Sequence, residues 1–88
     1  MKVKPGFILR EVADTYVVLP VGDAVMKFNG MLSLNETGVV LWRQLEQGAE
    51  MVDLVKALVE RYGIEEEKAQ RDVAAFLEAL SPVDCLED

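Results

Sequence analysis

The first third of the chain alternates between short apolar runs and turn residues. An apolar run covers residues 7–12, and a β-branched and aromatic run covers 15–19. Asp14 offers a turn residue between them, and Pro20 closes the second run. Runs of this length and composition on either side of a turn predict two antiparallel strands.

A second hairpin is predicted immediately after the first. Asn29-Gly30 separates the apolar segments 25–28 and 31–34. An Asn-Gly pair suits the positive φ angles of a type I′ turn, so these segments are expected to pair with each other. The segment 31–34 is then the last strand before the helices.

This last strand is the most informative segment for function. Alternation places Leu32 and Leu34 on one face and Met31 and Ser33 on the other. One face can therefore join the core while backbone groups at the sheet edge stay unpaired and able to accept a foreign strand. The sequence leaves three interpretations open, in which the edge accepts another chain, is covered by the N-terminus, or pairs with a second copy.

Three helices are predicted in the rest of the chain. The first follows Asn35, whose side chain suits a helix N-cap, and ends at Gly48. The second runs from about 50 to 62, because apolar residues recur at steps of three and four before Gly63. The third runs from about 65 to 80. Its apolar stripe consists of Ala69, Val73, Phe76, Leu77 and Leu80.

Several single residues have an ordinary structural interpretation. Trp42 has the spacing of a core residue, and Tyr62 and Phe76 are expected to fill the same core. The acidic triplet 65–67 suits the first turn of a helix, so no metal site is predicted there. Gly38 costs about 0.5 to 1 kcal/mol inside a helix, and it is either an ordinary tolerated glycine or a place where a neighbouring segment packs closely.

The order of elements predicts an α+β fold, with an N-terminal antiparallel sheet followed by three α-helices. No βαβ alternation is present, which excludes a parallel nucleotide-binding sheet. The 88 residues form one domain, because a chain of this length cannot build two cores. Three helices with a sheet also describe a winged helix-turn-helix domain.

Composition narrows the function classes. No apolar run reaches a membrane span and the N-terminus lacks the apolar core of a signal peptide, so a cytoplasmic protein is expected. The chain has no histidine, which excludes Ser/His and Cys/His catalytic pairs. The single Cys85 is expected near a frayed terminus and unreactive. We therefore expect no enzyme activity, no metal and no cofactor.

The charge is uneven along the chain. Residues 1–30 carry four basic and three acidic residues, whereas residues 31–88 carry five basic and thirteen acidic residues, within a net charge of −7. A field of this sign repels phosphate backbones and acidic membranes. Neither a nucleic acid nor a membrane is therefore an expected partner, and a basic or neutral one is favoured.

Several short segments of the sequence resemble the PqqD-like family. They are 7–11, 16–20, 28–30, and 34–38 running into Leu41-Trp42, followed by 53–58 with Tyr62 in the second helix and 72–80 in the third. The resemblance covers about residues 5–80. The chain departs from it where Ala49-Glu50 stands in place of a threonine cap, and where Ser81-Pro82 breaks the third helix early.

The resemblance implies a RiPP recognition element, which is a non-catalytic peptide-binding domain. Such a domain binds the leader of a ribosomally made precursor peptide and presents it to a modifying enzyme, often a radical S-adenosylmethionine protein. The leader adds as a strand to the last strand and packs against the third helix. Carried onto this chain, the resemblance implies the peptide-binding residues Met31, Leu32, Ser33, Leu34, Ala69, Val73, Phe76 and Leu77.

Two alternatives stay open from the sequence. The same sheet edge could serve a dimerising structural or interaction module, giving a homodimer. A winged-helix nucleic-acid binder would need a basic third helix, which here offers only Lys68 and Arg71 among many acids.

Overall fold

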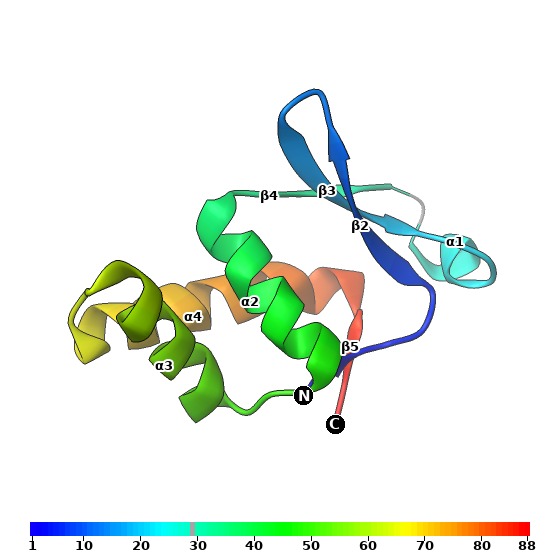
Figure 1. The fold of residues 1–88 in the computed structure, drawn as a ribbon. Coiled ribbons are helices and arrows are strands. Elements are labelled where there is room, and N and C mark those ends of the chain that lie inside the picture. The colour runs from blue at the N-terminus through cyan, green and yellow to red at the C-terminus, as the bar shows by residue number, and fades with distance from the viewer. Residues whose placement is uncertain (29) are drawn as a thin grey trace.

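The strands of the three-stranded sheet precede the long helices in the chain, in the predicted α+β order (Figure 1). The computed structural model describes residues 1–28 and 30–88. The strands are β1 (Lys2–Val3), β2 (Phe7–Val12), β3 (Thr15–Pro20), β4 (Leu32–Leu34) and β5 (Leu86–Glu87). The helices are α1 (Ala24–Lys27), α2 (Glu36–Gln47), α3 (Met51–Tyr62) and α4 (Glu66–Leu80), followed by a 3₁₀ turn at Ser81–Val83.

The first predicted hairpin is confirmed. β2 and β3 pair antiparallel, with Val12 opposite Thr15 at the turn. The two loop residues Ala13 and Asp14 have φ angles of 50° and 67°. Positive φ at both central residues is the signature of a type I′ turn, whose twist matches that of the flanking strands.

The second predicted hairpin is wrong in its first arm. Residues 24–27 form the short helix α1, and β4 pairs antiparallel with β3, in the sheet order β2-β3-β4. Local hydrogen bonds favour the helical turn, since the Met26 amide donates to the Asp23 carbonyl at 3.1 Å. Pairing with β3 also places Leu32 and Leu34 against the core. The predicted turn residue Asn29 lies outside the described residues.

The helix boundaries follow their local signals. The Gly38 amide donates to the Asn35 side chain at 2.8 Å, which confirms the predicted cap of α2. α2 is followed by Gly48 and α3 by Gly63, both with positive φ, and Ser81 follows the last residue of α4.

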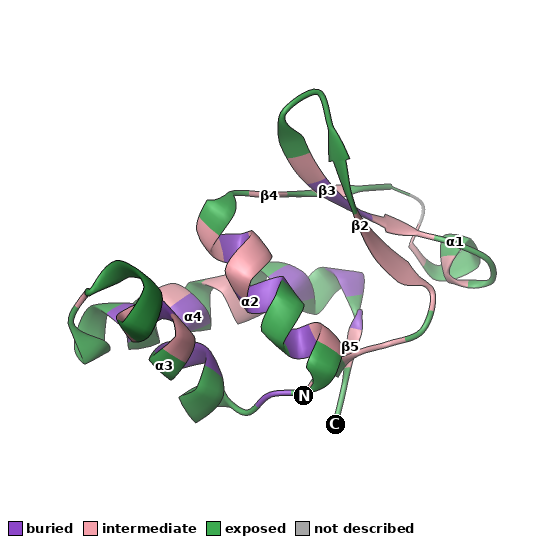
Figure 2. Cartoon of the chain, in the orientation of Figure 1, coloured by how far each residue is buried: buried purple, intermediate pink, exposed green. Residues whose placement is uncertain are grey.

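One core joins the three long helices to the sheet (Figure 2). Trp42 is fully buried, as predicted, and packs in the same cluster as Val18 of β3. Other fully buried side chains are Leu41, Leu45, Leu54, Leu58, Val73 and Leu80. Tyr62 was expected in this core but remains 37% exposed at the end of α3. Its hydroxyl donates to Glu36 at 3.4 Å, so the polar end of the ring faces the surface.

The chain ends meet in a second, two-stranded sheet that the sequence pattern does not predict. β1 pairs antiparallel with β5, and the Lys4 amide donates to the Cys85 carbonyl at 2.8 Å. The Lys4 ammonium also pairs with Asp84 at 3.1 Å. Cys85 is fully buried, so the expectation of a frayed segment around it is wrong. Strand pairing between the two ends draws this tail onto the core.

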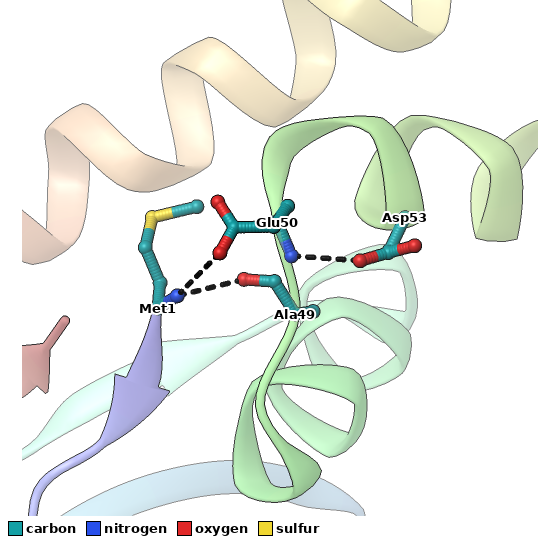
Figure 3. A network of polar contacts seen from close by, with 4 residues as sticks. All are labelled: Met1, Ala49, Glu50 and Asp53. Carbon is teal, nitrogen blue, oxygen red and sulfur yellow. Dashed lines mark hydrogen bonds and ion pairs between the residues drawn. The ribbon is translucent and has the colours of Figure 1, made fainter.

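The start of α3 is held without a threonine cap (Figure 3). The Glu50 amide donates to the Asp53 carboxylate at 2.8 Å, which satisfies one free amide at the helix start. The Met1 ammonium donates to the Ala49 carbonyl at 2.9 Å and lies 3.7 Å from the Glu50 carboxylate. The departure from the family pattern at this position is therefore compensated by side-chain and N-terminal contacts.

The burial of Cys85 predicts that its thiol reacts slowly with thiol reagents. Desolvation raises the pKa of the Cys85 thiol, so less thiolate forms at a given pH. We expect the reaction with Ellman's reagent at pH 8 to be at least about tenfold slower in the native chain than in urea. On raising the pH, the Cys85 thiol of the unfolded chain loses its proton at a lower pH than the thiol of the folded chain. The contribution of the protonated thiol to the free energy of unfolding is therefore lost as pH rises through the raised native pKa. Equal rates in buffer and in urea would contradict the buried position.

Candidate functional site

The outer edge of β4 is one of the two edges of the three-stranded sheet, the other being that of β2, and it is the one that lies beside residues of α4. β4 is the last strand in the order β2-β3-β4, so within residues 1–28 and 30–88 it has a strand partner on one side only. Its residues alternate in exposure, with Ser33 exposed and Leu32 and Leu34 half-buried. The predicted division of this strand into two faces is thus confirmed.

Hydrogen-bond alternation decides which backbone groups of β4 face outward. In a two-residue hairpin the residues beside the turn, here Val12 and Thr15, form a hydrogen-bonded pair. Every second pair along the ladder is then also bonded, and the Val21 amide indeed donates to the Gly6 carbonyl at 2.7 Å. The odd-numbered residues of β3 therefore direct their backbone groups toward β2.

The same alternation continues into β4. Tyr16 and Val18 direct their backbone groups away from β2, and they lie opposite Leu34 and Leu32. Leu32 and Leu34 are therefore bonded to β3, whereas Ser33 directs both its amide and its carbonyl to the open side. Ser33 is the position at which an added strand would form its central pair of hydrogen bonds.

A groove runs between β4, the start of α2 and α4. Its first part, the sheet-side hollow, has a volume of about 310 Å³. The residues lining it are Leu32, Ser33, Leu34, Asn35, Gly38, Phe76, Ala79 and Leu80. None of these side chains is charged, so this part of the groove suits apolar side chains.

The second part of the groove, the helix-side hollow, has a volume of about 370 Å³. The residues lining it are Asn35, Thr37, Gly38, Leu41, Asp72, Ala75 and Phe76. The two hollows share Asn35, Gly38 and Phe76, so they are direct neighbours. Asp72 is the one charged residue among those lining either hollow, and Lys68 lies 3.1 Å from its carboxylate.

Gly38 allows the helices to approach closely where the two hollows meet. A Cβ atom at Gly38 would lie 3.3 Å from the Phe76 ring and 3.3 Å from the Leu34 Cβ. These distances are tighter than ordinary contacts. Of the two interpretations of Gly38, the structure supports close packing by a neighbouring segment.

The structure brings only part of the predicted site together. Leu32, Ser33, Leu34 and Phe76 line the sheet-side hollow, and Met31 precedes β4 with 64% of its surface exposed. This placement agrees with the expected position of the site, whose role in peptide binding stays a prediction.

The three other predicted residues of α4 do not line the groove. Ala69 and Val73 have no exposed surface, and Leu77 packs against the core. The expectation that Ala69 and Val73 present side chains to a peptide is therefore wrong for this structure. Both occupy the middle of the apolar stripe, which faces the core.

The groove uses the flank of α4, which the apolar stripe did not identify. Asp72, Ala75 and Ala79 lie there beside Phe76. Small residues on one side of a stripe are the signal that could have indicated this face, since they leave space above the helix. The polar residue Asn35, predicted only as a cap, also lines both hollows.

A larger hollow of about 600 Å³ lies on the other side of Asn35. It is bordered by the β2–β3 turn, α2 and the end of α3, and it includes Asp14, Glu36 and Arg61. Ser33 does not line it, so it has no access to the outward backbone groups of β4. Size alone therefore does not make it the candidate site.

Two kinds of site are absent from the described ranges 1–28 and 30–88. No three His, Cys, Asp or Glu side chains within them gather closely enough to hold a metal ion. No helix in these ranges combines the length and apolar character that a bilayer crossing requires.

Comparison with known families decides the affiliation of the chain. The family model described as "Coenzyme PQQ synthesis protein D (PqqD)" matches residues 15–84. The chain belongs to the PqqD family. The match contains β3, β4 and all the long helices, so it covers both walls of the groove. No curated protein matches the chain.

Two solved structures share the PqqD-type fold of this chain. One is described as "TbiB1 in Complex with the TbiA(beta) Leader Peptide", with a TM-score of 0.79 and 25% sequence identity over 99% of this chain and 95% of that chain. The other is "Lasso peptide synthetase B1 complexed with the leader peptide", with a TM-score of 0.70 and 24% identity over 91% of this chain and 88% of that chain. At 24% identity, the second structure shows that the fold is similar and nothing further.

The assignment of backbone directions in β4 can be tested without a ligand. We expect the Ser33 amide, which faces the open side, to exchange with solvent about tenfold faster than the amides of Leu32 and Leu34. Amide hydrogen exchange followed by NMR measures all three in one sample. A Ser33 amide that exchanges more slowly than those of both leucines would refute the assignment.

Proposed function

We propose that residues 1–88 form a non-catalytic peptide-binding domain that recognises the leader of a ribosomally made precursor peptide. The domain presents this peptide to a separate modifying enzyme, for which radical S-adenosylmethionine proteins are the class implied by the family resemblance. The leader adds as a strand along β4, and its side chains enter the groove beside α4.

The open edge of β4 carries this proposal. Ser33 offers an outward amide and carbonyl next to an uncharged hollow, which is the arrangement that strand addition requires. Membership in the PqqD family supports it, as does the similar fold of TbiB1, whose structure was determined with a leader peptide.

Energetics favour a few apolar anchors over many backbone contacts. Each added backbone hydrogen bond contributes about 0.5 to 1.5 kcal/mol net. Association costs at least about 4 kcal/mol, so β4, with three residues, cannot supply the affinity through hydrogen bonds alone. Side chains that enter the groove near Leu32, Leu34 and Phe76 supply the rest.

The proposed role is that of an adaptor, and the chemistry belongs to its partner. The chain has no histidine, and its one thiol, at Cys85, is buried with a raised pKa. Asp72, the charged residue of the groove, already pairs with Lys68. These residues suit binding and offer no nucleophile activated by a neighbouring base.

A homodimer is the second candidate, because the same edge of β4 can pair with a second copy. The N-terminus does not cover the edge, since β1 pairs with β5. Light scattering with and without peptide separates the two: the adaptor is a monomer that binds one peptide, whereas a homodimer through β4 dissociates or excludes the peptide.

A proline at Ser33 tests strand addition directly. Ser33→Pro removes the outward amide, and we expect it to weaken leader binding by about tenfold. Ser33→Ala retains the amide and removes only an exposed hydroxyl, so it should bind within about twofold of the wild type. The measurement is a fluorescence titration with the leader of a precursor peptide encoded beside this chain's gene.

NMR of the same complex shows where the peptide binds. We expect amide shift changes at residues 31–34 and along the groove face of α4. Shifts confined to other surfaces would contradict the proposal, as would equal losses in Ser33→Pro and Ser33→Ala. Circular dichroism of both variants checks that each is folded.

A further inference from the structure

We infer that the groove selects an extended peptide with the pattern basic-x-apolar-x-apolar. The pattern is written from the N-terminus of the peptide, and x stands for any residue. This inference rests on the proposed function, because it needs a peptide strand on β4. It adds the side-chain chemistry of the peptide and assigns specificity to Asp72.

The backbone of Ser33 sets the register. Both strand pairings of the sheet are antiparallel, so we place the peptide strand antiparallel to β4 as well. The peptide residue opposite Ser33 then exchanges two hydrogen bonds with it and shares its solvent-facing side. The residues before and after lie opposite Leu34 and Leu32, and their side chains point to the same face as these leucines.

Both of these neighbouring peptide side chains meet the sheet-side hollow. Leu32 and Leu34 line it from the strand, while Phe76, Ala79 and Leu80 line it from α4. A polar side chain here would lose water without gaining a charged partner. Two apolar residues, separated by one position, therefore suit this part of the groove.

The helix-side hollow follows in the direction of the peptide's N-terminus. Along the groove, α4 contributes Ala79 beside β4 and Asp72 beyond it, near Thr37. One helical turn from Phe76 to Asp72 rises about 6 Å, and two residues of an extended peptide span about 6.6 Å. The peptide residue two positions before the one opposite Leu34 therefore reaches Asp72 on the same face.

The charge of this hollow favours a basic side chain. Asp72 is its charged residue, and its side chain keeps 37% of its surface exposed. The partner Lys68 is 56% exposed and can turn toward solvent when a second cation arrives. Residues 31–88, with thirteen acidic and five basic residues, add a field that attracts a basic peptide.

A peptide selection tests the order without knowledge of the natural precursor. A display library of random twelve-residue peptides is selected on the immobilised wild-type chain, and in parallel on Asp72→Asn and Glu78→Gln. Glu78→Gln is the matched control, because it removes the same charge from the same helix at an exposed position that lines neither hollow. Asp72→Asn loses only the exposed pair with Lys68, and circular dichroism checks that it folds.

On the wild type and on Glu78→Gln we expect enriched peptides with the order basic, any, apolar, any, apolar. On Asp72→Asn the apolar spacing should persist and the basic preference should disappear. For one enriched peptide made with Lys and with Gln at the basic position, we expect about fivefold tighter binding of the Lys form to the wild type. On Asp72→Asn the two forms should bind equally.

The results distinguish the inference from the proposed function. Enriched peptides that bind the groove without a basic residue, or with the reversed order, overturn the inference and leave strand addition intact. A basic preference that survives in Asp72→Asn also overturns it. A selection that enriches no peptide, or only peptides whose amide shifts lie away from residues 31–34, overturns the proposed function itself.

Discussion

An edge strand that is held firmly on one side and left unpaired on the other is the constraint on which this structure depends. Leu32 and Leu34 bond to β3 and pack toward the core, while Ser33 between them directs its backbone outward. Unpaired edges invite aggregation as well as binding. The strand has three residues, and the exposed Ser33 is polar, which limits how much of another chain the edge can pair with unless side-chain anchors help.

The groove exists because α4 approaches the start of α2 without covering β4. Gly38 permits the Phe76 ring to lie against the first turn of α2, and Asn35 caps that turn. Both residues also line the two hollows. Stability and recognition are thus connected at one point, since a change at Asn35 or Gly38 alters the helix start and the groove together.

Local signals in the sequence were sufficient for the helices and the first hairpin. Asn35, Gly48 and Gly63 act through their own backbone and nearest neighbours, so their effect does not depend on distant parts of the chain. The hairpin turn at Asp14 is of the same kind. The expected strand at residues 24–27 is wrong because local hydrogen bonds form a helical turn there, and β4 pairs with β3 instead. The expectation for the Cys85 tail is wrong because the conformation of the tail depends on β1, at the other end of the chain.

The candidate site shows the same division. The sequence by itself determined that residues 31–34 form a two-faced strand and that α4 has one apolar side, because alternation and helical period are local properties. Only the tertiary structure decided that Ala69 and Val73 face the core while Asp72, Ala75 and Ala79 face the groove. A helical stripe gives the direction of burial but not the position of the neighbouring sheet, and that position determines which flank of the helix stays open.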